Sequence, residues 1–72
     1  MSADDLDVGS LIVRDAVREL PERQRDALFL RYYLDLDYRS IADALGVEVG
    51  TVSATLYAAR AALAQALQEV QK

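Results

Sequence analysis

The sequence contains neither cysteine nor histidine, and the two absences exclude several kinds of chemistry. Without cysteine there is no disulfide and no thiolate nucleophile, and without either residue there is no zinc-finger ligand set. Histidine, the usual general base, is missing as well. The chain also has no glycine-rich phosphate loop and no nucleophile beside a base. We therefore expect no enzymatic activity, no metal and no cofactor.

Long apolar runs are also missing. No stretch approaches the ~20 apolar residues that a membrane span needs. The amino terminus carries Asp4, Asp5 and Asp7, whereas a signal peptide begins with positive charge. We therefore expect a cytoplasmic protein with no membrane contact.

Positive charge is scarce, with 8 basic residues against 12 acidic ones and a net charge of −4. Proteins that bind nucleic acids gain most of their affinity when Lys and Arg neutralise phosphates. The overall composition therefore argues mildly against DNA binding. Most of the arginines nevertheless lie in the first forty residues, so the charge is not spread evenly.

The chain has the size and composition of one small folded domain. It has 72 residues, of which 53% are apolar and 28% charged, a balance that favours a packed core over disorder. Residues 1–7 are polar and acidic without apolar periodicity, and we expect them to be a disordered lead-in. The domain itself is expected over residues 8–72.

Apolar residues recur every three to four positions, which predicts an all-α fold with four helices. The expected helices cover residues 8–19, 21–33, 38–45 and 49–70. Pro21 separates the first two, Asp37 is expected to cap the third, and Gly46 is expected to end it. We expect Tyr32 and Tyr57 to pack against neighbouring helices. In the last helix the predicted inner positions include Val52, Leu56, Ala59 and Leu63.

The third and fourth helices have the spacing of a helix-turn-helix, with the turn at Leu45–Glu48. In this motif the second helix lies in the major groove of DNA. Helical bundles also contain such a step for purely structural reasons. The spacing alone therefore leaves DNA binding open.

Five blocks of residues match the pattern of one protein family. They are residues 20–23 (LPER), 30–33 (LRYY), 38–47 (YRSIADALGV), 49–52 (VGTV) and 59–63 (ARAAL). In this order and spacing they resemble region 4 of bacterial sigma-70-type transcription factors, especially the extracytoplasmic-function group, from about Val17 to Leu67. The resemblance implies a domain that recognises the minus-35 promoter element and docks on the flap of the RNA polymerase beta subunit. It also implies sequestration by an anti-sigma factor.

The candidate DNA-binding residues are Arg39, Thr51, Ser53, Thr55 and Arg60. The three hydroxyl groups can hydrogen-bond to bases or phosphates, and the two arginines can reach the DNA backbone. Other interpretations stay open: Thr51 as a cap of the first helical turn, Ser53 and Thr55 as a solvated face, and Arg60 in an ion pair with an acidic residue of the first two helices.

The chain departs from the family at three positions that usually carry Lys or Arg. They hold Ser53, Thr55 and Ala58 instead. A bidentate contact between Arg and guanine contributes about 1 to 3 kcal/mol of discrimination, so these losses weaken recognition. Glu48 adds negative charge beside the expected phosphates. We therefore expect this chain to bind promoter DNA more weakly than is usual in the family.

An alternative function keeps the same fold. The chain would then be a protein-interaction module, similar to sigma region 4, whose DNA binding is weak or lost. Its partner would be an anti-sigma factor, the polymerase or a second copy. The net charge and the alanine-rich last helix favour this alternative.

Overall fold

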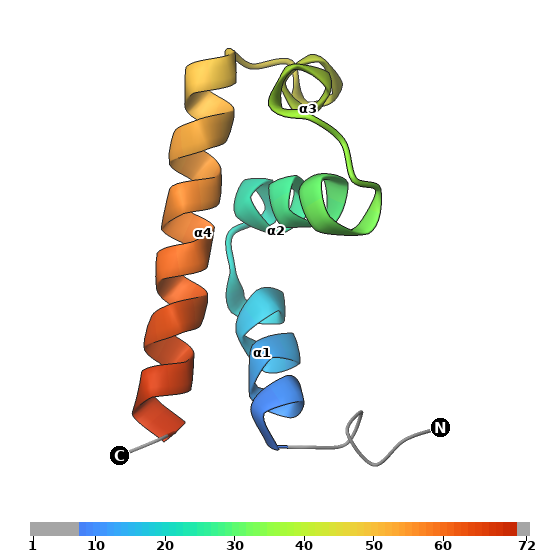
Figure 1. The fold of residues 1–72 in the computed structure, drawn as a ribbon. Helices are drawn as coiled ribbons and strands as arrows, with labels where there is room; N and C mark the ends of the chain where they lie inside the picture. The colour runs from blue at the N-terminus through green and yellow to red at the C-terminus, as the bar shows by residue number, and fades with distance from the viewer. Residues whose placement is uncertain (1–7, 71–72) are drawn as a thin grey trace.

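The chain folds into helices that are joined by short loops (Figure 1). The computed structural model describes residues 8–70, so the lead-in expected over residues 1–7 lies outside the described residues. The elements are α1 (Val8–Glu19), α2 (Glu22–Leu28), the π-helical segment η2 (Phe29–Tyr33), α3 (Tyr38–Leu45) and α4 (Val49–Val70). Since η2 continues α2, these elements confirm the expected all-α, four-helix architecture with a helix-turn-helix.

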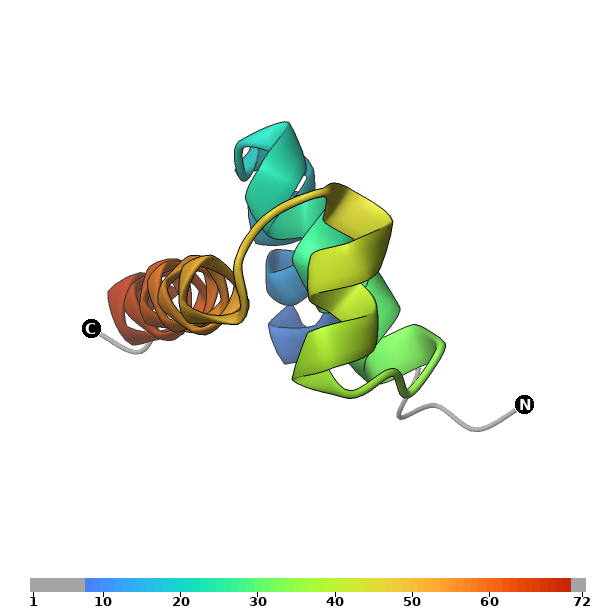
Figure 2. The same cartoon turned by 90° about the horizontal axis from the view of Figure 1, so that it is seen from above.

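Helix α4 is the longest element, and α1, α2 and α3 all pack against it. In Figure 1, α1 runs beside the second half of α4 in the opposite direction, whereas α2 crosses near its middle and α3 lies near its start. Figure 2, which looks along α4, shows the other helices on one side of it. None of the described helices is long and apolar enough to cross a membrane.

The break between α1 and α2 falls at Leu20 and Pro21, as predicted. Pro21 has an extended backbone with φ −53° and ψ 148°, and its carbonyl accepts a hydrogen bond from the amide of Arg25 at 3.0 Å. Pro21 is therefore the cap of α2, and the helix begins one residue later than expected. Leu20 turns into the core, where it is buried.

The second expected helix is not α-helical to its end. From Phe29 to Tyr33 it is a π-helix, and the amide of Leu34 donates to the carbonyl of Phe29, five residues back, at 3.2 Å. Asp35 then has φ +58°, a left-handed conformation that Asp tolerates better than most residues. The helix expected over residues 21–33 is therefore confirmed in its extent, but its last five residues are π-helical. The apolar spacing contains no signal for this wider turn.

The π-helical segment presents three aromatic side chains to the surface. Phe29, Tyr32 and Tyr33 are 51%, 60% and 76% exposed. The rings of Phe29 and Tyr33 stack with centroids 4.9 Å apart. The expectation that Tyr32 packs against neighbouring helices is therefore only partly met, because most of its side chain lies in solvent. A π turn holds more residues than an α turn, so it changes the direction of the side chains that follow it.

Both ends of α3 have the predicted caps. The carboxylate of Asp37 accepts a hydrogen bond from the amide of Ser40 at 2.8 Å, and this bond is the main reason that the pKa of Asp37 is lowered. At the other end Gly46 has φ +70°, and the amide of Val47 donates to the carbonyl of Ala42 at 3.0 Å. This pairing is the Schellman motif, in which a left-handed residue closes a helix.

The core is one apolar cluster formed by α2, α3, α4 and the break after α1, and Val17 of α1 packs against it. Helix α4 supplies Val52, Leu56 and Ala59, which are fully buried and confirm the predicted spacing. The remaining buried residues are Leu20, Ala27, Leu28, Ile41 and Ala42. A domain of this size has little stability in reserve, so each buried group contributes a large share of it.

The left-handed backbone of Gly46 gives the first prediction. Gly46→Ala should lower the free energy of unfolding by about 1 to 2 kcal/mol, because an L-residue is strained at this φ. No atom lies within 4 Å of the added Cβ, so steric contact contributes nothing. Gly50→Ala is the matched control. It lies in helix α4 with equally open space, so alanine should raise stability by up to about 1 kcal/mol. Urea unfolding measures both, and equal effects of the two substitutions would contradict the proposed strain.

The cap at Asp37 gives a prediction of pH dependence. Because the pKa of Asp37 is lowered in the folded protein, its ionised form stabilises the fold above the unfolded-state value of about 4, and this contribution disappears as the pH falls through the folded-state pKa. Asp37→Asn keeps an acceptor for the cap but does not titrate. The parent should therefore be more stable than the variant near pH 7, and the difference should shrink in acid. A difference in urea midpoint that stays constant from pH 7 to pH 3 would rule this out.

Candidate nucleic-acid interface

Helices α3 and α4 form a helix-turn-helix whose turn comprises residues 46–48 (Figure 1). The carbonyl of Glu48 accepts hydrogen bonds from the amides of Thr51 at 3.0 Å and Val52 at 3.2 Å, so α4 begins directly after the turn. Val47 packs against the core and fixes the turn in place. The amides of the exposed residues Val49 and Gly50 precede these bonds and donate none, and such helix ends attract phosphate groups.

The buried side of α4 determines which of its residues face outward. Val52, Leu56 and Ala59 point into the core, and a helix turns by about 100° per residue. The opposite side of the first turns therefore carries Ala54 and Tyr57. Tyr57 is 75% exposed, so the expectation that it packs in a half-buried position is wrong.

The predicted hydroxyl residues do not gather on one side of α4. Thr51 and Ser53 are both exposed. Because they are two positions apart, their side chains differ in direction by about 200° around the helix axis and lie on opposite flanks of the outward face. Thr55 is only partly exposed and lies on the flank of Thr51, closer to the core. Arg60 shares the flank of Ser53, about two turns further along the helix.

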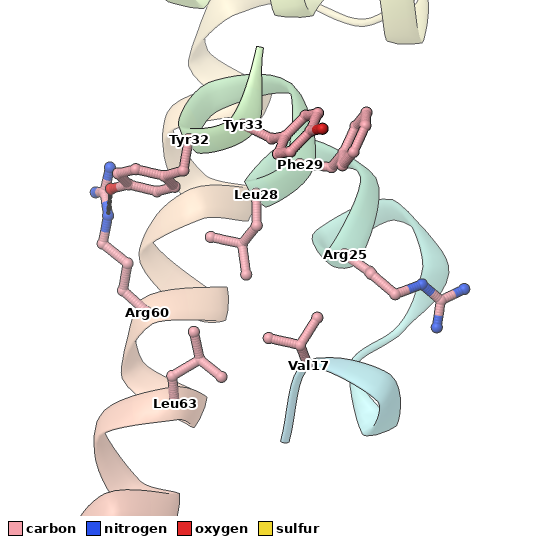
Figure 3. Close-up of a pocket in the computed structure, with 8 residues that line it drawn as sticks. All are labelled: Val17, Arg25, Leu28, Phe29, Tyr32, Tyr33, Arg60 and Leu63. Carbon is pink, nitrogen blue, oxygen red and sulfur yellow. Dashed lines mark hydrogen bonds between the residues drawn. The ribbon is translucent and has the colours of Figure 1, made fainter. Parts of the chain in front are cut away.

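Arg60 is held by two tyrosines rather than by a carboxylate. Its Nε donates to the hydroxyl of Tyr32 at 2.7 Å (Figure 3). One terminal nitrogen donates to the hydroxyl of Tyr38 at 3.4 Å. The guanidinium carbon lies 5.6 Å from the centre of the Tyr32 ring, a cation–π contact. The hydrogen bonds to Tyr38 and Tyr32 raise the pKa of Arg60. The sequence-based alternative of an ion pair is thus replaced by a tyrosine cluster.

The other arginines near the motif have different surroundings. Arg31 donates to the carbonyl of Leu36 at 3.0 Å and lies over the ring of Tyr38, so it ties η2 to the start of α3. Arg39, the second residue of α3, is exposed. Arg31 therefore supports the fold, whereas Arg39 is accessible to a partner.

The charge on the helix-turn-helix is nearly balanced. Arg39 and Arg60 are its cations, and Asp43, Glu48 and Glu69 are its acidic residues. Within residues 8–70 no cluster of acidic side chains is arranged to hold a metal ion. Because the helix-turn-helix has only these two cations, any affinity for DNA must also come from the amides of α4 and from uncharged side chains.

A family model described as sigma-70, region 4 matches residues 10–63. The chain belongs to the sigma-70 region 4 family. The matched residues extend from α1 through the helix-turn-helix to Leu63 of α4, so they include both the buried stripe and the exposed start of α4. The resemblance found in the sequence blocks is thereby confirmed.

A relative from Pseudomonas aeruginosa, the RNA polymerase sigma-H factor, is 41% identical over 56 residues. The aligned part is 78% of this chain and 29% of the relative. The chain thus spans less than a third of that sigma factor. The similarity concerns the region 4 domain and does not extend to the rest of the relative.

Tyr57 is the surface residue that the sequence analysis missed. A signal for it was present, because the spacing of Val52, Leu56 and Ala59 already determines which positions of α4 face outward. The tyrosine partners of Arg60 had no such signal, since Tyr32 and Arg60 are 28 residues apart.

The Arg60 cluster can be tested by NMR. The Nε–H of Arg60 should exchange with water more slowly than that of exposed Arg39, because it donates to the hydroxyl of Tyr32. Tyr32→Phe removes this acceptor and should speed the exchange. Tyr57→Phe removes an exposed hydroxyl outside the cluster and should leave the rate unchanged. Equal exchange rates in all three proteins would show that the hydrogen bond does not form in solution.

Proposed function

We propose that this chain is the promoter-recognition domain of a bacterial sigma factor. In this proposal α4 contacts the minus-35 element and the domain docks on the flap of the RNA polymerase beta subunit, in the cytoplasm. The observation that carries it is the exposed first half of α4 within a helix-turn-helix of the sigma-70 region 4 family. The relative with a sigma factor name agrees with this role. Membership of the extracytoplasmic-function group stays a prediction.

The outward face of α4 supplies the base contacts in this proposal. Tyr57 and Ala54 offer apolar surface, which suits the methyl group of thymine, and the hydroxyls of Ser53 and Thr51 reach bases or phosphates from either flank. Thr55, which is half-buried, lies at the edge of this surface. The amides at the start of α4 bind a phosphate.

Arginines contact the DNA backbone in the same proposal. Arg60 is positioned by two hydroxyl groups, so less side-chain entropy is lost when its remaining N–H groups bind a phosphate. Arg39 is exposed at the start of α3, the helix that crosses the backbone in this motif. With only these two cations on the helix-turn-helix, DNA binding is weak and depends on the other domains of the sigma factor.

A second candidate function is a protein-interaction module with weak or lost DNA binding. The exposed aromatic residues of η2 favour it, because three such side chains in one short segment are unusual on a surface with no partner. An anti-sigma factor or the polymerase is the partner in this case. A chain with weak DNA binding can serve both functions. A measurement of DNA binding therefore shows whether promoter recognition is retained.

The test is a selection of the purified chain on short random-sequence duplexes at low salt, followed by titration with the enriched sequence and a scrambled copy. The parent should prefer the enriched duplex. Ser53→Lys should strengthen binding, because it adds a phosphate contact beside the major groove of the DNA. The slope of log affinity against log salt concentration should become steeper by about one unit.

Gln65→Lys is the matched control for this titration. It adds the same charge to an exposed position of α4, about three turns beyond Ser53 and away from the helix-turn-helix. It should change affinity less than Ser53→Lys. An equal gain from both lysines would indicate unspecific attraction, and no enrichment at low salt would reject promoter recognition.

A further inference from the structure

The residues of α4 that meet base edges in the proposed function follow from the burial of the helix. Val52 and Leu56 have no exposed surface, and the side of the helix away from them carries Ala54, Tyr57 and Ala58. All three are exposed and lie in the first three turns, the part of a recognition helix that contacts bases. We call Ala54, Tyr57 and Ala58 the base-facing residues.

The first three turns of α4 lack the side chains that read guanine, adenine and cytosine. In the major groove guanine is read by Arg or Lys, adenine by Asn or Gln, and cytosine by a carboxylate. Residues 49–59 contain none of these. The methyl group of thymine is recognised by apolar contact instead, and alanine and an aromatic ring supply it. Thymine is therefore the base whose distinguishing group the base-facing residues match.

Arg60, the first charged residue of α4, lies away from the base-facing residues. Its direction around the helix axis differs from that of Ala54 by about 120°. Its Nε donates to the hydroxyl of Tyr32 at 2.7 Å, and its guanidinium carbon lies 5.6 Å from the centre of the Tyr32 ring (Figure 3). These contacts hold the guanidinium beside η2, so it does not serve as a reader of guanine.

The hydroxyl groups that flank the base-facing residues do not select a base. Thr51 and Ser53 each carry a hydroxyl that donates one hydrogen bond and accepts others, so it can pair with the edge of any base. They add affinity, and the choice between bases is left to the apolar side chains.

We propose that this chain recognises a minus-35 element of A·T base pairs, which the base-facing residues read through thymine methyl groups. The proposal rests on the proposed function, because it specifies the class of DNA sequence that the recognition face takes. Ala54 and Ala58 are about 6 Å apart along the helix axis, and successive bases of one strand are about 3.4 Å apart. The face can therefore contact the methyl groups of neighbouring thymines.

Deoxyuridine tests the methyl contacts, because it pairs like thymine but lacks the methyl group. Selection of the parent on random duplexes should enrich a motif of A·T base pairs. Replacing its thymines one at a time by deoxyuridine should weaken binding about two- to fourfold at the contacted positions, the effect of one buried methyl group. Exchange of such a pair for C·G should also weaken binding, and 5-methylcytosine should restore part of the loss. Deoxyuridine that binds as well as thymine at every position overturns the proposal, since the preference then comes from DNA shape.

Two exposed tyrosines separate the contact from a general effect of aromatic surface. Tyr57 and Tyr33 are 75% and 76% exposed, but Tyr33 lies in η2. Tyr57→Ala should abolish the difference between thymine and deoxyuridine at one position of the motif, and Tyr33→Ala should keep it. If both variants keep every difference, Tyr57 does not read a methyl group and the proposal is wrong as stated.

A new reader of guanine tests the orientation of α4. Ala54→Arg should select a motif with guanine at one position, because Arg pairs with guanine in the major groove. Ala64→Arg is the matched control: it makes the same substitution at an exposed position about 15 Å further along the helix, and it should select the parent motif. Arg is nearly as good a helix former as Ala, and circular dichroism checks that both variants fold. The same motif from both variants contradicts the orientation on which the proposal depends.

The motif selected by the parent distinguishes this proposal from the proposed function. A motif whose guanines are required for binding overturns the reading of thymine and leaves promoter recognition standing. No enrichment at low salt overturns both.

Discussion

The burial of one stripe on α4 determines most of what this domain can do. Val52, Leu56 and Ala59 have no exposed surface, and α1, α2 and α3 all pack against the helix that carries them. Because a helix has a fixed period, burying this stripe also decides which residues face solvent. Tyr57 and Ala54 are thereby placed outward at the start of α4, where a helix-turn-helix meets DNA.

The outward face of α4 carries unusually few positive charges for a DNA-binding helix. A typical DNA-binding helix adds cations to its outward face, whereas α4 has Arg60 as its single arginine within the described residues. In the proposed function, recognition rests on the amides of the first turn, on hydroxyls and on the ring of Tyr57. Such contacts orient a domain on DNA without attracting it strongly. This balance fits a domain whose position is also fixed by protein partners.

Arg60 lies where the helix-turn-helix meets the π-helical segment. It lines an apolar groove between α1, the α2–η2 segment and α4, and its hydrogen bonds reach Tyr32 in η2 and Tyr38 at the start of α3. Tyr32 lies exposed in the π-helical segment, and Arg31 holds the next loop by donating to the carbonyl of Leu36. Arg60 therefore links α4 to η2 and to the first residue of α3 by side-chain hydrogen bonds.

The sequence by itself determined the helices, their ends and the family. Pro21, Asp37 and Gly46 act through their own backbone or over three to five residues, so local chemistry suffices to place them. The candidate site was only partly predictable, since the apolar spacing locates the outward face of α4 but not the partners of its residues. The tertiary structure decided the π-helical segment and the pairing of Arg60 with Tyr32. The pairing of Arg60 with Tyr32 joins segments 28 residues apart, and the π turn leaves the apolar spacing of the helix unchanged, so residue spacing within one helix carries no information about either.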